Sequence, residues 1–339
     1  MSGISVNTDR AIRLEENLIL ASIVVPDEVF AYYIAGNNSE LTLDYVMRIG
    51  PSAFYSCTNL TTADFPQVTT IESYAFQYCS SLTSVNFPLA TTIGTSAFDR
   101  CSSLTSVSFP EVITIGEAAF SSCSSLTTVS FPQVTTIGER AFYSCPNLTT
   151  VDFPRATNIG SRAFDTCLSL TSVSFPQVTT IGGGAFSPCR NLTSVSFPQA
   201  TTIGYSAFAS CTSLVTADFP QATTIGSSAF YYCPSLTSVS FPQVTTIGGG
   251  AFDRCSSLTS VSFPQATTIG HSAFASCTSL TSIYLGASSV CTLSHSNAFS
   301  TTGITRTTGS IFVPTSLVTA YQSATNWVYF SSRIFGYTF

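Results

Sequence analysis

The sequence repeats itself every 22 residues, and this period constrains the fold more than any other feature. Cysteine recurs eleven times without a slip, at positions 57, 79, 101, 123, 145, 167, 189, 211, 233, 255 and 277. The same unit surrounds each cysteine, with residues 236–255 as a clear copy. A fixed period of this length indicates a solenoid in which each unit forms one coil.

Each unit contains the pattern of one short strand with a single buried face. Val239 and Phe241 alternate with Ser238 and Ser240, and this period of two is typical of such a strand. Pro242 ends the strand because it has no N–H to donate to a ladder. The Ile-Gly pair that follows predicts a second short extended piece, and the Ala-Phe-x-x-Cys segment predicts a helical or 3₁₀ turn returning to the next strand.

A single coil buries too little apolar surface to offset the conformational entropy of its 22 residues, so the coils must stack. Positions equivalent to Phe241 run from 43 to 285 and number twelve. We therefore predict an α/β-type repeat solenoid with one long parallel β-sheet of about 12 strands, about 53 Å long at ~4.8 Å per strand.

Non-repetitive flanks predict a cap at each end. Residues 1–37 contain an apolar stretch and then Pro26 with two acids, as at the start of a helix. The pair Ala298-Phe299 arrives three residues late, and residues 311–313 indicate one last strand before a helix over 315–331 that would cover the last coil. The predicted domains are an N-terminal cap, the repeat array and a C-terminal strand with a helical cap, at 1–37, 38–300 and 301–339.

The unit Leu-x-x-Val-x-Phe-Pro-x-x-x-x-Ile-Gly-x-x-Ala-Phe-x-x-Cys-x-x-Leu resembles the BspA-like leucine-rich repeat, also called the Treponema pallidum type. The closing stretch from Ile311 to Tyr321, with Asn326-Trp327 after it, is similar to the C-terminal end of such proteins from gut-associated Firmicutes. The resemblance covers roughly residues 40 to 335. It implies a right-handed, curved coil with the sheet on the inner face, and a cell-surface protein, since some members are adhesins for host matrix proteins or other microbes.

Charge and hydropathy exclude two classes of partner. All eleven cationic residues are Arg, there is no Lys, and the net charge is −6, so no basic stripe exists to bind nucleic acid. The apolar run from Leu18 to Val25 is too short to span a bilayer, and we expect no membrane insertion. No signal peptide is visible in this chain: it was removed, or export uses another route, or the protein stays inside its cell. We expect a monomer.

The cysteines predict a buried ladder of free thiols. Residues one coil apart are ~4.8 Å apart with parallel side chains, whereas a disulfide favours a Cβ separation of ~3.8 Å. A line of thiols does not give the tetrahedron that zinc requires, and no C-x-x-C pair occurs, so we expect no metal site. Cys291 falls outside the register and is the expected exception to the ladder.

Neither the acids nor the histidines predict catalysis or a cofactor. Asp64, Asp152 and Asp218 share one strand position but are four and then three coils apart, about 19 and 14 Å. His271 and His295 have no nucleophile at a recognised spacing. We expect a protein that is not an enzyme.

Positions that vary between copies cluster after the Ile-Gly pair and between the Phe and the Cys. Several of them carry Tyr or Arg, the residue types enriched in binding hot spots. The alternative is neutral drift at positions where packing is indifferent. The predicted binding residues, centred on Tyr231, Tyr232 and Arg254, are Tyr78, Arg100, Tyr143, Tyr205, Tyr231, Tyr232 and Arg254.

These observations predict an exported surface protein that adheres to a host or microbial surface protein or glycan. One alternative is a phage or prophage tail-associated recognition protein, which needs no signal peptide and whose first 37 residues would dock to a particle. A minor alternative is ice binding, because paired threonines recur in successive units, as at 179–180, 201–202 and 223–224.

Overall fold

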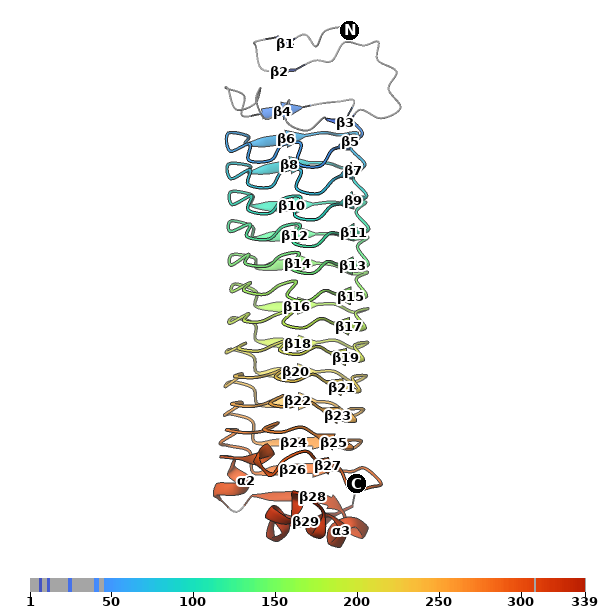
Figure 1. Cartoon of the computed structure of the whole chain (residues 1–339), viewed down its shortest axis with the longest axis vertical. Helices are drawn as coiled ribbons and strands as arrows, with labels where there is room; N and C mark the ends of the chain where they lie inside the picture. Colours follow the sequence, from blue (N-terminus) through green and yellow to red (C-terminus); the bar gives the residue numbers. More distant parts are fainter. Residues whose placement is uncertain are drawn as a thin grey trace. The chain divides into compact units, whose positions relative to one another are not determined.

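The computed structural model describes residues 6–7, 11–12, 24–25, 40–42, 46–307 and 309–338. The chain forms two compact units, a first unit of residues 1–156 and a second unit of residues 157–339. Each is a parallel β-solenoid with the 22-residue period (Figure 1). The predicted N-terminal cap over 1–37, with its helix start at Pro26, lies almost wholly outside the described residues, and the boundaries at 37/38 and 300/301 stay predictions.

In the first unit, each coil contributes two short strands. Three-residue strands, polar-apolar-polar, form two parallel ladders of three: β4 (Glu40–Thr42), β6 (Thr62–Asp64) and β8 (Ser84–Asn86), then β10 (Ser106–Ser108), β12 (Thr128–Ser130) and β14 (Thr150–Asp152). Two-residue strands form one parallel ladder: β3 (Val24–Val25), β5 (Arg48–Ile49), β7 (Thr70–Ile71), β9 (Thr92–Ile93), β11 (Thr114–Ile115) and β13 (Thr136–Ile137). An antiparallel pair, β1 (Val6–Asn7) and β2 (Ala11–Ile12), precedes them.

The second unit repeats this arrangement. Its longer strands form two ladders of four: β16 (Ser172–Ser174), β18 (Ser194–Ser196), β20 (Thr216–Asp218) and β22 (Ser238–Ser240), then β24 (Ser260–Phe263), β26 (Ser282–Leu285), β28 (Ser310–Pro314) and β29 (Ile334–Tyr337). Its two-residue strands form one ladder: β15 (Asn158–Ile159), β17 (Thr180–Ile181), β19 (Thr202–Ile203), β21 (Thr224–Ile225), β23 (Thr246–Ile247), β25 (Thr268–Ile269) and β27 (Thr292–Leu293).

The strand prediction is confirmed, with one refinement. Within the described part of the chain, twelve strands from β4 to β26 stand at the predicted position, as Figure 1 shows for the even labels. Within each unit, however, the ladder that continues from coil to coil is that of the two-residue strands, predicted only as a second extended piece.

Columns of phenylalanine rings fill the core. In the first unit, the rings of Phe98 and Phe120 stack at 5.1 Å and those of Phe109 and Phe131 at 5.5 Å, with planes within 11° of parallel. All four are fully buried, and the Ile, Leu, Ala and Cys at the recurring positions of each repeat in the first unit, from Phe54 onward, are at most 5% exposed. Stacking therefore lets each coil share its apolar surface with its neighbours.

Glycine follows Ile in most coils because successive coils lie close together there, although Glu72 follows Ile71. A Cβ on Gly116 would lie 2.6 Å from the carbonyl carbon of Gly94 and 2.7 Å from the backbone nitrogen of Thr95. No real Cβ tolerates such contacts, so a larger residue would push the two coils apart.

The return segment differs from the predicted helical turn. In most coils it is a run of tight turns in which two residues have positive φ, as at Ser96 (52°) and Arg100 (61°). Their N–H groups donate to carbonyl oxygens of the next coil, at 2.8 Å in both cases, instead of closing a helix. The predicted 3₁₀ turn occurs at η1 (Ser296–Phe299), the late copy of the segment.

The C-terminal cap is present, but the single helix predicted over 315–331 is wrong. The chain forms η2 (Thr315–Leu317), α3 (Val318–Ser323) and η3 (Trp327–Arg333), after a short α2 (Gly303–Arg306). Asn326, with a φ of 65°, interrupts the helical path. No helix in the described ranges is long and apolar enough to cross a bilayer.

The cap closes the core with aromatic rings. Trp327 and Phe330 pack on Phe299 of the last coil, with ring centroids at 6.0 and 5.4 Å. The predicted strand at residues 311–313 is β28, but β29 follows it, so it is not the last strand.

Candidate functional site

The predicted binding residues stand mainly in the turn between the buried Phe of a coil and its Cys. In the second unit, the N–H of Tyr232 donates to the carbonyl oxygen of Asp253 and the N–H of Arg254 to that of Ala275, both at 2.8 Å. Both residues have positive φ, 55° and 65°. Because the flanking Phe and Cys are buried, the side chains of the two residues between them line up from coil to coil along the surface. We call the predicted residues at these two positions the Tyr/Arg edge. They are Tyr78, Arg100, Tyr143, Tyr231, Tyr232 and Arg254.

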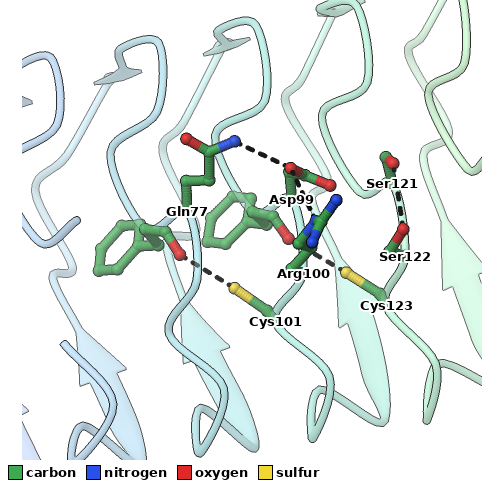
Figure 2. A network of polar contacts seen from close by, with 9 residues as sticks. Gln77, Asp99, Arg100, Cys101, Ser121, Ser122 and Cys123 are labelled. Carbon is green, nitrogen blue, oxygen red and sulfur yellow. Dashed lines mark hydrogen bonds and ion pairs between the residues drawn. The ribbon is translucent and has the colours of Figure 1, made fainter. Parts of the chain in front are cut away.

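In the first unit, Tyr78 and Arg100 come together. The guanidinium carbon of Arg100 lies 5.1 Å from the centroid of the Tyr78 ring, one coil away, which is a cation–π contact. Asp99 lies beside them: its carboxylate accepts a 2.8 Å hydrogen bond from the Gln77 amide and is 3.9 Å from the Arg100 guanidinium (Figure 2). The ring of Tyr55 meets Tyr78 edge-on at 5.6 Å.

The second unit contains a similar cluster, in which the ring beneath the Arg stands one residue earlier in its turn. Arg254 lies over the ring of Tyr231 at 5.6 Å, and the rings of Tyr231 and Tyr232 are 6.4 Å apart. Burial raises the pKa of the neighbouring Asp253 carboxyl above its usual range, and the Arg254 guanidinium opposes part of this rise. The three predicted central residues thus form one contact cluster.

Tyr143 and Tyr205 lie outside these clusters. Tyr143 is half-buried and stands two coils beyond Arg100 along the first unit. Tyr205 is 60% exposed, and its ring covers Gly183 of the preceding coil, where a Cβ would lie only 2.2 Å from the nearest ring carbon. His271 covers Gly249 in the same way.

The cysteines have a structural role. All twelve are free and buried, including Cys291, the predicted exception. The thiol of Cys123 donates to the carbonyl oxygen of Phe98 at 3.1 Å, and that of Cys101 to Phe76 at 3.2 Å (Figure 2). Burial raises the pKa of the Cys145 and Cys211 thiols to about 12, so they are not nucleophiles at neutral pH.

The remaining ionisable candidates have local partners. Asp64 accepts a hydrogen bond from the Asn86 amide at 2.8 Å, and the imidazole of His295 accepts one from the N–H of Asn297 at the start of η1. Among the residues that the structure describes, no three His, Cys, Asp or Glu side chains gather to hold a metal ion.

The paired threonines form exposed columns beside the two-residue strands. In one column each hydroxyl donates to the carbonyl oxygen of the preceding coil, as from Thr223 to Thr201 at 3.3 Å and from Thr245 to Thr223 at 3.2 Å. These hydroxyl protons are used within the fold and are not free to order a water layer. Ice binding remains an untested prediction.

Sequence reasoning missed Gln77, Asp99 and Asp253, although a signal was present. The dipeptide Asp-Arg precedes the repeat cysteine in two coils, at 99–100 and 253–254, and in each case the preceding coil has Tyr before its own cysteine. The coincidence of these neighbours would have located both clusters.

Comparison with known proteins supports the repeat assignment. A family model described as the BspA type leucine rich repeat region matches residues 24–133, 47–167, 113–224, 157–280 and 223–325. No curated protein matches the chain.

Several solved structures are similar. A leucine-rich repeat protein from Bacteroides ovatus is 25% identical over 89% of this chain and 84% of its own, with a TM-score of 0.63. The leucine-rich repeat protein of T. pallidum is 30% identical, over 45% of this chain and 77% of its own, with a TM-score of 0.44. A leucine-rich cell surface protein from Faecalibacterium prausnitzii is 26% identical, over 78% and 76%, with a TM-score of 0.41.

Proposed function

This chain belongs to the BspA-type leucine-rich repeat family, and on that premise we propose that it is a non-enzymatic recognition protein, exposed on a cell surface or secreted. It binds a protein or glycan of a host or microbial surface through the Tyr/Arg edge. The observation that carries the proposal is the stacking of an Arg guanidinium on a Tyr ring between successive coils, once in each unit.

The stacked pairs are suited to binding. Each guanidinium is exposed but supported by a ring, which limits the side-chain entropy lost when a partner is bound. Tyr and Arg contribute more binding energy than other residue types because they combine large apolar area with directional hydrogen bonds. The carboxylates of Asp99, which is buried, and Asp253, which is half-buried, do not remove the charge of the Arg residues, which are exposed to solvent.

Packing does not require these side chains. Ser122 and Ser276 occupy the same turn position in other coils, with similar positive φ values of 58° and 57°. The backbone conformation is therefore a property of the coil and not of Tyr or Arg. A variant that shortens these side chains should remain folded.

The test is binding of the purified protein to arrays of glycans, matrix proteins and whole bacterial cells. We compare it with a Tyr231→Ala, Tyr232→Ala, Arg254→Ala variant. Removing a hot-spot cluster costs at least about 2 kcal/mol, so binding should weaken at least ~30-fold. Tyr329→Ala is the matched control, since Tyr329 is a 73% exposed cap residue in the same unit.

The outcomes separate the alternatives. Loss of binding in the triple variant but not in Tyr329→Ala supports recognition through the Tyr/Arg edge, and the class of target distinguishes host adhesion from phage-type recognition. Equal binding by the triple variant and the parent chain contradicts the proposed site.

A further inference from the structure

The face of the last sheet changes from polar to aromatic within one ladder. In the second unit, Ser262 of β24 pairs with Tyr284 of β26, which pairs with Phe312 of β28, which pairs with Phe335 of β29. The equivalent outward position is Ser in β16, β18 and β22 and Asp in β20. Tyr337, at the end of β29, adds a fourth ring.

These four rings touch one another and form a cluster, which we call the aromatic platform. Tyr284 and Phe312 stack at 4.7 Å with planes 13° apart, and Phe335 continues the column at 6.4 Å. The Tyr337 ring lies across Tyr284 and Phe312, at 5.2 and 6.0 Å and at steep angles.

The platform faces solvent, and its rings are not part of the hydrophobic core. Phe335 is 48% and Tyr337 45% exposed, while Tyr284 and Phe312 are half-buried. The opposite face of the same strands carries the core residues Ile283, Ile311 and Ile334, at most 3% exposed. Exposed, contiguous aromatic rings cost solvation free energy, which a bound ligand recovers.

A column of hydroxyl groups runs beside the rings on the same face. Ser260, Ser282 and Ser310 pair in register. They stand two residues before Ser262, Tyr284 and Phe312, respectively, and so about 7 Å from them along the strand. Ser260 is exposed, and Ser282 and Ser310 are half-buried. The face thus offers ring surfaces next to hydroxyl donors and acceptors.

Charge selects the class of ligand. None of the strands β24, β26, β28 and β29 carries an ionisable acid or base other than the two Tyr phenols. A phosphorylated or sulfated ligand would meet no cation on these strands, and two copies of a chain of net charge −6 repel each other. An uncharged sugar ring matches the platform, because its C–H face packs on aromatic rings and its hydroxyls bond to the serine column.

We infer that the aromatic platform is a binding site for a neutral saccharide built of pyranose rings. The site uses none of the residues of the Tyr/Arg edge and goes beyond the proposed function. It lies on the last ladder of the second unit and would act whether or not the Tyr/Arg edge binds a partner.

The probes are the neutral polysaccharides hydroxyethylcellulose, xylan, laminarin and mannan, each cast into a native gel in which this anionic chain migrates. Retardation by at least one of them is expected, with about a 10-fold or greater loss of affinity in a Phe335→Thr, Tyr337→Ser variant. The milder Tyr337→Ser variant, checked for an unchanged urea midpoint, should show a partial loss. Tyr329→Ser removes a 73% exposed ring of η3 that is not part of the platform, and should bind like the parent chain.

Each contrary result is decisive. The inference is overturned if no neutral polysaccharide retards the chain, if the double variant is retarded like the parent, or if only the charged polygalacturonate binds. Sedimentation that shows a dimer of the parent chain and a monomer of the double variant would assign the platform to contact between copies instead. Loss of retardation in the Tyr231→Ala, Tyr232→Ala, Arg254→Ala variant but not in Tyr337→Ser would return the binding to the Tyr/Arg edge.

Discussion

The thiol of Cys211 donates a hydrogen bond to the carbonyl oxygen of Phe186, 25 residues earlier in the chain, at 3.2 Å. The same bond recurs at Cys233, Cys255 and Cys277, each with the Phe of the preceding coil. Each cysteine therefore fills a small apolar position, and its thiol adds a second hydrogen bond to a buried carbonyl that already accepts a backbone N–H, as that of Phe186 does from Cys189 at 2.8 Å.

Burial of these thiols predicts that the protein loses stability at alkaline pH. The pKa of Cys211 is raised to about 12 in the folded chain, chiefly because burial disfavours the thiolate, whereas an unfolded thiol ionises near pH 8.5 to 9. The stabilising effect is complete below pH 8 and is lost as pH rises from about 9 to 12, by about 1.4 kcal/mol per pH unit for each such thiol.

Cys211→Ser tests this linkage, because serine keeps a donor for Phe186 but does not titrate. Urea unfolding followed by circular dichroism at pH 7.5 and 10.5, under reducing conditions, gives the free energy of unfolding. The loss between the two pH values should be about 2 kcal/mol smaller in the variant. An identical loss in both chains would mean that Cys211 does not remain neutral in the folded state at pH 10.5.

The phenylalanine columns predict large costs for truncation. Phe186 stacks between Phe164 and Phe208, at 5.3 Å from each, and is fully buried. Phe186→Ala should lower the free energy of unfolding by about 3 to 5 kcal/mol because neighbouring coils, joined by backbone ladders, leave the cavity open. Val215→Ala, at a 41% exposed site, is the control and should change it by less than about 0.5 kcal/mol. A loss below 1 kcal/mol for Phe186→Ala would contradict the shared core.

The fold was predictable because one local pattern recurs with an exact period. The pattern of Val239 and Phe241 followed by Pro242 defines the strand. The exact period then places equivalent residues of successive coils opposite each other, as Val195 pairs with Ala217. The interruption of the cap helix was not predictable. It depends on Asn326, whose side-chain amide donates to the carbonyl oxygen of Leu293 at 2.7 Å. A repeating sequence pattern does not reveal such a long-range contact.

The candidate site was predictable in part. Variation between copies pointed to Tyr231, Tyr232 and Arg254, and the structure places them in contact. The aromatic platform was missed because Phe335 and Tyr337 follow the repeats, in a strand that only the pairing with β28 reveals. Tyr284, in place of a serine within the register, was the available signal.

The contact between Gly183 and Tyr205 predicts that the effect of Gly183→Ala on the free energy of unfolding depends on whether the Tyr205 ring is present. Other coils carry Ser161 or Ser227 where Gly183 stands, so its backbone accepts a side chain, and Gly→Ala at such a site stabilises by about 0.4 to 1 kcal/mol. In the parent chain a Cβ there would lie 2.2 Å from the nearest carbon of the Tyr205 ring, which must then leave the surface it covers. Gly183→Ala should therefore fail to stabilise the parent chain but stabilise the Tyr205→Ser variant.

A double-mutant cycle with thermal or urea unfolding measures this coupling. An interaction free energy of at least about 0.5 kcal/mol between the two substitutions is expected. Additive effects would show that the Tyr205 ring does not rest on Gly183 in solution.

Tyr321 anchors the cap through a single hydroxyl. Its oxygen accepts a 2.8 Å hydrogen bond from the buried N–H of Cys291, and Trp327 donates to the carbonyl oxygen of the same residue at 2.6 Å. Tyr321→Phe keeps the ring but leaves that N–H unpaired, so the free energy of unfolding should fall by about 1 to 3 kcal/mol. Fluorescence of Trp327, the single Trp of the chain, reports the unfolding of this region during a urea titration. Tyr329→Phe, at a largely exposed ring, is the control and should have no effect. An equally small change for Tyr321→Phe would show that the Cys291 N–H finds another acceptor and that the cap is held by ring packing alone.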